Sequence, residues 1–210
     1  MASTKVSARQ RLLDAADRLF YSEGVHTVGI DRVIGEAGVA KGSLFYNFSG
    51  KDELVAAYLA GRDHQRRERI SRHQQGLADP IDRLLAMFDA LQEAVDSAGW
   101  KGCPFANANA EALPGSVEAV ALRTFRDWLA GEMEALCQEA GIAEPAGVAS
   151  RLRLLYDGAV ANSHLDAQPE AVRWAKELAS SVLENSPRVP DQAMKAVSGV
   201  SSSGSGGGLA

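Results

Sequence analysis

The sequence predicts an all-α protein. Of its 210 residues, 46% are hydrophobic but only 6% are aromatic, and Ala and Leu recur three and four residues apart, as on the buried face of a helix. Gly and Pro stand where such stretches end and begin. We therefore expect packed helices rather than a sandwich or barrel.

Three helices are expected near the N-terminus. The first covers about 7–23, and Gly24 ends it. Its apolar stripe consists of Leu12, Ala15, Ala16, Leu19 and Phe20. Two shorter helices are expected over about 30–37 and 41–47, separated by Gly38. Ser49 and Asp52 have the spacing of a capping box, which predicts a long helix through residue 75.

Later helices are expected to begin at prolines, because proline is tolerated in a first turn. They start near Pro80 and Pro104, then cover about 116–140, 145–165 and 169–184. After Pro187 the composition turns to "VSGVSSSGSGGGLA". Such a stretch cannot bury enough surface to fold, so residues 187–210 are predicted to be a disordered tail.

The charge is unevenly distributed. Residues 1–72 hold 12 Lys and Arg against 9 Asp and Glu, whereas the remainder holds 10 against 18. A mildly basic head on an acidic body suits a DNA-binding module joined to another domain, although ordinary charge scatter also explains it. No apolar run is long enough to span a bilayer, and "MASTKVSARQ" has no apolar signal core, so we expect a cytoplasmic protein.

The segment "IDRVIGEAGVAKGSLFYNF" has a helix-turn-helix layout, in which the second helix can enter the DNA major groove. Lys41 and Ser43 stand on the leading turn of that helix, where they favour phosphate, and Gly42 permits close approach. Tyr46 can contact a thymine methyl or a phosphate. Asn47 and Lys51 can hold the DNA backbone. Taken singly, Lys41 and Lys51 also read as solvated charges, and Phe45 and Phe48 as core residues.

Residues 9–58 resemble the N-terminal domain of the tetracycline-repressor (TetR) family of regulators. The resemblance rests on "LLDAADRLFYSEGVHTVGIDRV", "AGVAKGSLFYNF" and "GKDEL". It implies an all-α fold: a three-helix helix-turn-helix DNA-binding domain, here 1–50, and a larger helical ligand-binding and dimerisation domain, 51–186, in which 51–75 is a linking helix. The positions it implies for DNA contact are Thr27, Gly29, Lys41, Gly42, Ser43, Phe45, Tyr46, Asn47 and Lys51.

Three positions depart from the family pattern. Phe45 stands where tyrosine is usual, which removes a hydroxyl contact. Asn47 replaces a histidine or tyrosine, and Gly29 occupies the usual Ser/Thr capping site. Glycine in place of a capping Ser or Thr costs only a few tenths of a kcal/mol. These departures change individual contacts rather than the class.

In the second domain, "GWKGCPFANANAEAL" and "LRLLYDGAVA" resemble segments of one TetR subgroup. Aromatic and polar side chains there are candidates to line a ligand cavity, although aromatics at helical spacing also serve as core. The candidates are Met87, Phe88, Trp100, Phe105, Asn107, Trp128 and Tyr156. Cys103, at a helix start, is a conceivable redox sensor or a small buried hydrophobe. The cysteines and histidines show no metal-ligand spacing, and we expect no metal or cofactor.

The last helix carries two apolar stripes. One consists of Ala171, Trp174, Leu178 and Val182, and the other of Val172, Ala175, Ala179 and Leu183. One stripe can meet the body while the other meets a second subunit, so the last two helices are predicted to form a homodimer interface. A monomer capped by its last helix is the alternative.

The arginines between 62 and 72 are interpreted as a solvated face rather than a DNA stripe. Asp63 with Arg67 and Glu68 with Arg72 have the spacing of ion pairs within one helix.

These observations predict a ligand-responsive transcriptional regulator. The form they favour is a homodimeric repressor that binds a palindromic operator and is released by a small molecule. An enzyme is not expected, because the Gly-x-Ser-x-Gly, phosphate-loop and His-Glu-x-x-His motifs are missing. The rival is a catalytically silent ligand-binding or scaffold protein. The effector, the operator and the direction of regulation are left open.

Overall fold

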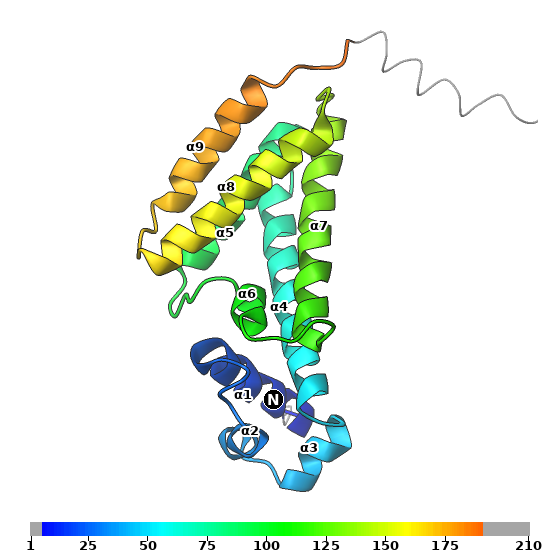
Figure 1. Cartoon of the computed structure of the whole chain (residues 1–210), viewed down its shortest axis with the longest axis vertical. Helices are drawn as coiled ribbons and strands as arrows, with labels where there is room; N and C mark the ends of the chain where they lie inside the picture. The colour runs from blue at the N-terminus through cyan, green and yellow to red at the C-terminus, as the bar shows by residue number, and fades with distance from the viewer. Residues whose placement is uncertain (1–5, 191–210) are drawn as a thin grey trace, which may run out of the picture.

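The computed structural model describes residues 6–190, and that part of the chain contains nine α-helices and no β-strand. Helices α1 (Ala8–Glu23), α2 (Ile30–Ala37) and α3 (Lys41–Asn47) form a small unit at one end of the molecule (Figure 1). Helix α4 (Lys51–Gln74) leaves this unit and runs into the body. The all-α prediction is confirmed.

The body is built around α4. Helices α5 (Pro80–Asp96) and α7 (Val117–Glu139) pack against it, and the short α6 (Pro104–Asn109) lies between the body and α1. Helices α8 (Pro145–Leu165) and α9 (Ala171–Glu184) pair at the far end (Figure 1). The two ends of the molecule are therefore connected through α4, α6 and α1.

Local signals explain most helix boundaries. Ser7 and Ser116 cap α1 and α7 by accepting backbone N–H bonds, and Asp79 caps α5. Gly38 ends α2 in the left-handed conformation (φ 60°), which glycine adopts without a side-chain clash. The predicted bounds of α2 and α3 agree with the structure residue for residue.

All five residues of the predicted α1 stripe are buried. They pack with buried residues of α2, α3 and α4 into one continuous core that extends through the body. The small unit is therefore held by the same kind of apolar packing as the larger one, rather than by surface contacts.

Three sequence predictions need correction. Helix α9 begins at Ala171, because Pro169 lies in the preceding turn. The predicted Ser49–Asp52 capping box does not form, because Gly50 is the N-cap and the Glu53 carboxylate accepts the Ser49 N–H at 2.7 Å. The predicted disorder cannot start at residue 187: Ala143 N–H donates to the Pro187 carbonyl at 2.9 Å, and Arg188 pairs with Ile142. Residues 191–210 of that tail lie outside the described part.

Candidate DNA interface and effector cavity

Helices α2 and α3 are fixed to each other by buried side chains. Val33 of α2 and Leu44 of α3 are fully buried, and Val39 packs against the same core from the turn between them. The Gly38 N–H bonds back to carbonyls of α2. These contacts hold α3 in one orientation and leave its opposite face free.

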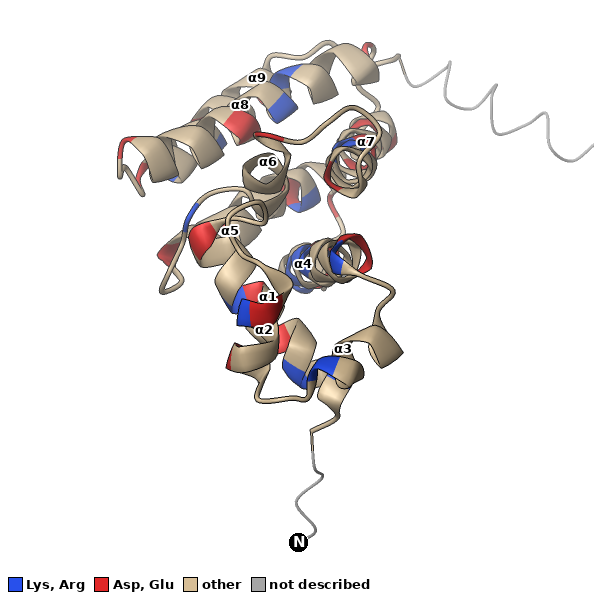
Figure 2. Cartoon of the chain, turned by 60° about the horizontal axis from the view of Figure 1, so that its bottom comes forward, with Lys and Arg blue, Asp and Glu red and all other residues tan. Residues whose placement is uncertain are grey.

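That free face of α3 is apolar and aromatic. Tyr46 is 90% exposed and Phe45 is 51% exposed, whereas Phe48 is buried. The alternative that places Phe45 in the core is therefore wrong, and the same alternative is confirmed for Phe48. Helix α3 contains Lys41 and no acidic residue, and Figure 2 shows it without a red segment. Exposed aromatics on a helix without negative charge suit a surface that meets another molecule.

Two of the candidate contact residues have partners within the chain. Lys41 Nζ lies 2.9 Å from Asp31 Oδ1, and both side chains are exposed. The Asn47 amide donates one N–H to the Ser43 carbonyl at 2.7 Å, and its nitrogen carries a second N–H that can donate to a phosphate. An exposed ion pair contributes only about 0–1 kcal/mol, so Lys41 can exchange Asp31 for a stronger anion.

The remaining candidates surround α3. Gly42 is exposed and Ser43 half-buried in its first turn, and Lys51 is the half-buried first residue of α4. Thr27 and Gly29 are exposed just before α2, where Gly29 is an N-cap without a side-chain bond. The whole predicted set thus belongs to the α2–α3 unit and the start of α4, at one end of the molecule (Figure 1).

The small unit of α1, α2 and α3 is tied to the body at α1. The Tyr21 hydroxyl donates to the Gly102 carbonyl at 3.0 Å and accepts the Lys101 N–H at 2.8 Å. Arg62 of α4 lies over the Tyr21 ring at 4.1 Å and donates to Asp17 of α1 at 2.9 Å. Burial raises the pKa of Tyr21, so its hydroxyl stays a neutral donor. Helix α1 is therefore bonded both to α4 and to the segment before α6.

A cavity of about 320 Å³ lies between α4, α6, α7 and α8. Two of the predicted ligand-binding residues, Asn107 and Tyr156, line it. The other lining residues are Arg66, Gly102, Cys103, Ala106, Leu122, Phe125, Arg126, Asp157, Val160, Ala161, His164 and Leu165. Its volume is at the lower end of the range for small-molecule sites, about 300–1,000 Å³.

The other predicted ligand-binding residues are distributed around the body. Phe105 stacks on Phe125 at 4.7 Å and lines a second cavity, on the other side of these rings. Phe88 lines a third beside α9. Met87 is fully buried, and Trp100 and Trp128 are half-buried; none of these three lines the cavities described. Their roles stay predictions.

The interpretation of the arginines as a solvated face is wrong for Arg62 and Arg66. Arg62 pairs with Asp17 across helices, and Arg66 is only 6% exposed. The Asp63–Arg67 pair is confirmed at 2.7 Å, but Arg72 pairs with Glu93 rather than Glu68. The sequence did carry a signal for Arg66, because it continues the buried stripe of Val55, Leu59 and Ile70 along α4.

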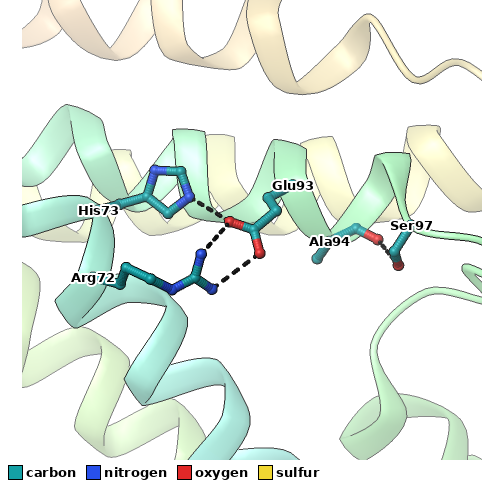
Figure 3. Close-up of polar contacts among 5 residues, drawn as sticks. All are labelled: Arg72, His73, Glu93, Ala94 and Ser97. Atoms are coloured by element: carbon teal, nitrogen blue, oxygen red, sulfur yellow. Dashed lines mark hydrogen bonds and ion pairs between the residues drawn. The ribbon is translucent and has the colours of Figure 1, made fainter.

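The far end of α4 is fixed to α5 by a charged cluster (Figure 3). Arg72 donates two bonds of 3.1 Å to the Glu93 carboxylate, and His73 Nε2 lies 2.7 Å from the same group. Bonds from Arg72 and His73 lower the pKa of Glu93 to about 2. One turn further along α5, the Ser97 hydroxyl donates to the Ala94 carbonyl. The cluster therefore anchors the end of α4 that lies away from the small unit of α1, α2 and α3.

Comparison with known proteins agrees with this arrangement. Residues 12–58 match the family model described as bacterial regulatory proteins, tetR family. SrpR and TtgW, HTH-type transcriptional regulators of Pseudomonas putida, of which the second is called uncharacterized, are each 38% identical over 63 residues. That region is 30% of this chain, 30% of SrpR and 47% of TtgW, so the chain matches less than half of these relatives.

A solved structure extends the similarity over nearly the whole fold. SCO4454, a TetR-family transcriptional regulator from Streptomyces coelicolor, is 32% identical and superposes with a TM-score of 0.80 over 85% of this chain and 95% of its own. The chain therefore belongs to the TetR family of transcriptional regulators. Within residues 6–190, none of the helices combines the length and apolarity that a membrane span requires.

Proposed function

We propose that this chain is a homodimeric, cytoplasmic repressor that binds a palindromic operator through α3 and releases it when a small ligand binds the body. The observation that carries the proposal is the exposed Phe45–Tyr46 face of an acid-free helix, held rigidly at one end of the molecule. Such a helix is the element that enters the major groove in helix-turn-helix proteins.

The contacts divide by chemistry. Tyr46 and Phe45 meet base edges, above all thymine methyl groups. Lys41, Ser43, Asn47 and Lys51 hold phosphates and set the register, as Thr27 does before α2. A Cβ added at Gly42 or Gly29 meets nothing within 4 Å in the chain, so the absent side chains leave room for DNA rather than for the protein itself.

The dimer interface is assigned to the outer face of α8 and α9. Trp174 and Leu178 are 45% and 56% exposed, and Leu154 of α8 is 73% exposed. The adjoining stripe of α9, from Val172 to Leu183, is buried against the body. A two-fold axis through this face makes a self-complementary four-helix contact and places two α3 helices about 34–36 Å apart, one turn of DNA.

The ligand acts by preferring one conformation. A ligand that binds more tightly to the conformation whose α3 spacing does not fit DNA lowers operator affinity, by at most the ratio of its affinities for the two conformations. A ligand with equal affinity for both conformations shifts nothing. The cavity suits this role because Gly102 and Cys103 line it, and Gly102 is bonded to Tyr21 of α1.

Mobility shifts test the proposal. Fragments of the gene's own upstream region are mixed with the purified protein at two salt concentrations. We expect one fragment to be retained specifically and less strongly at the higher salt. The scaffold would be favoured instead if no DNA is retained, either here or after selection from random DNA, and the protein binds another protein through α3.

A further inference from the structure

The cavity between α4, α6, α7 and α8 holds a buried positive charge without a carboxylate partner. Arg66 is 6% exposed, and among residues 6–190 no Asp or Glu lies within ion-pair distance of its guanidinium. Its one polar neighbour at bonding distance is Cys103 Sγ, at 4.0 Å. A buried charge is costly unless it is paired, so a lone one marks a place where a partner is missing.

The surroundings of Arg66 support the cation but do not neutralise it. The guanidinium lies 4.3 Å from the Phe125 ring centre and 5.6 Å from that of Phe105. The other arginine of the cavity, Arg126, is already bonded to Asp157 at 2.9 Å. Counted by its arginines and carboxylates alone, the lining carries two arginines and one carboxylate, a formal surplus of one positive charge.

Apart from Asn107, Tyr156 and His164, the rest of the cavity lining is largely apolar. Leu122, Val160 and Leu165 form its walls with the ring of Phe125. Tyr156 contributes a buried hydroxyl, and burial raises its pKa, so it remains a neutral hydrogen-bond donor. An occupant must therefore offer one negative charge to Arg66 and an apolar body to the walls.

We propose that the effector is a small aromatic carboxylate whose carboxylate pairs with Arg66. This inference rests on the proposed function and specifies its ligand class. A guanidinium binds a carboxylate through two parallel bonds. The rings of Phe125 and Tyr156, together with the aliphatic walls, accommodate an apolar planar body. Phosphate fits less well, because it carries about −1.5 to −2 charges at neutral pH against a surplus of one.

The same residue connects the ligand to the DNA-binding unit. Arg66 follows Arg62 by one turn of α4, and Arg62 holds Tyr21 and Asp17 of α1. Gly102 lines the cavity and accepts the Tyr21 hydroxyl bond. A carboxylate that draws Arg66 toward itself therefore acts on α4 and on the α6 entry, and both of these contact α1.

Calorimetry on the full chain without DNA tests the ligand class. The probes are benzoate, cinnamate and 2-naphthoate, each compared with its neutral primary amide. We expect at least one acid to bind one molecule per chain at least tenfold more tightly than its amide. If none of the three acids is preferred to its amide, the proposal is wrong, and this comparison needs no variant.

Two variants assign the preference to Arg66. Arg66→Met should abolish it, and Arg66→Lys should retain part of it. Arg69→Met is the matched control, because Arg69 is a half-buried arginine of the same helix that does not line the cavity. An acid preference that survives in Arg66→Met, or that is lost equally in Arg69→Met, would overturn the assignment.

The outcome is independent of the operator experiment. Specific DNA retention without acid preference would leave the regulator standing and refute this ligand class. Acid binding through Arg66 without any DNA site would refute the proposed regulator and leave the cavity's ligand class intact.

Discussion

The Tyr21 hydroxyl bridges Gly102 and Lys101, residues about eighty positions later in the chain, with bonds of 3.0 and 2.8 Å. Through this bridge α1 of the DNA-binding unit is bonded to the segment that enters α6 and lines the cavity. Arg62, stacked on the same ring, brings α4 into the contact. One phenol thus joins α1, α4 and the segment before α6.

Tyr21→Phe removes both bonds and keeps the ring. We expect it to lower the free energy of unfolding by about 1–3 kcal/mol, because the partly buried Gly102 carbonyl loses its donor, whereas water can replace the hydroxyl at the exposed Lys101 N–H. Urea unfolding measures the loss. Tyr46→Phe is the control, since Tyr46 is 90% exposed; an equal loss in both variants would show that the bridge adds nothing.

Lys51→Ala and Tyr46→Ala should weaken DNA binding in different ways. Removing Lys51 deletes a phosphate contact, so affinity should fall for all sequences. The slope of log affinity against log salt concentration should become shallower by about one. Removing Tyr46 should change the preferred base at one operator position. Fluorescence anisotropy on a set of operator variants separates the two. The assignment fails if both variants lose the same affinity on every sequence.

Leu178→Glu should convert the proposed dimer to a monomer. The substitution places a charge in the centre of the exposed α8–α9 face, where it would be buried without a partner in the two-fold contact. Light scattering after gel filtration gives the mass. Leu113→Glu is the matched control, because Leu113 is 76% exposed in the loop before α7. A wild-type protein that is already monomeric, or a Leu178→Glu protein that stays dimeric, contradicts the assigned interface.

Acid should weaken the α4–α5 anchor. The pKa of Glu93 falls from 4.5 to about 2 in the folded chain, so its contribution to stability is present above pH 4.5 and is lost as the pH falls toward 2. The group is exposed, and we expect a contribution of about 1 kcal/mol or less. Glu93→Gln should therefore be less stable than wild type at pH 7, and the two should converge near pH 2 in urea titrations. If the stability difference between wild type and Glu93→Gln does not change with pH, it does not come from the Glu93 carboxylate.

Local patterns were sufficient to predict the bounds of the helix-turn-helix elements, α2 and α3. Gly38 indicated where α2 ends, because a glycine in the left-handed conformation commonly terminates a helix. The apolar residues on either side of it then left room for only one short helix before and one after the turn. The exposure of Phe45 was not predictable in the same way, since an aromatic at helical spacing fits a core equally well until the partner helices are placed.

The cavity was less accessible to sequence reasoning. Arg66 continues the apolar stripe of α4, but its charged neighbours at helical spacing favoured a solvated position, and the rings of Phe105 of α6 and Phe125 of α7 that lie against it could not be placed from the sequence. The Tyr21 bridge likewise joins residues far apart in the chain. Contacts of this kind depend on the packing of distant helices, which one sequence does not specify.

Selection from random duplex DNA with the purified full chain tests the central claim most directly. The account predicts enrichment of an inverted repeat whose half-sites lie about one helical turn apart, bound by two chains and released more easily at higher salt. Recovery of no preferred sequence, with retention that depends on salt alone, would contradict the claim that α3 reads an operator.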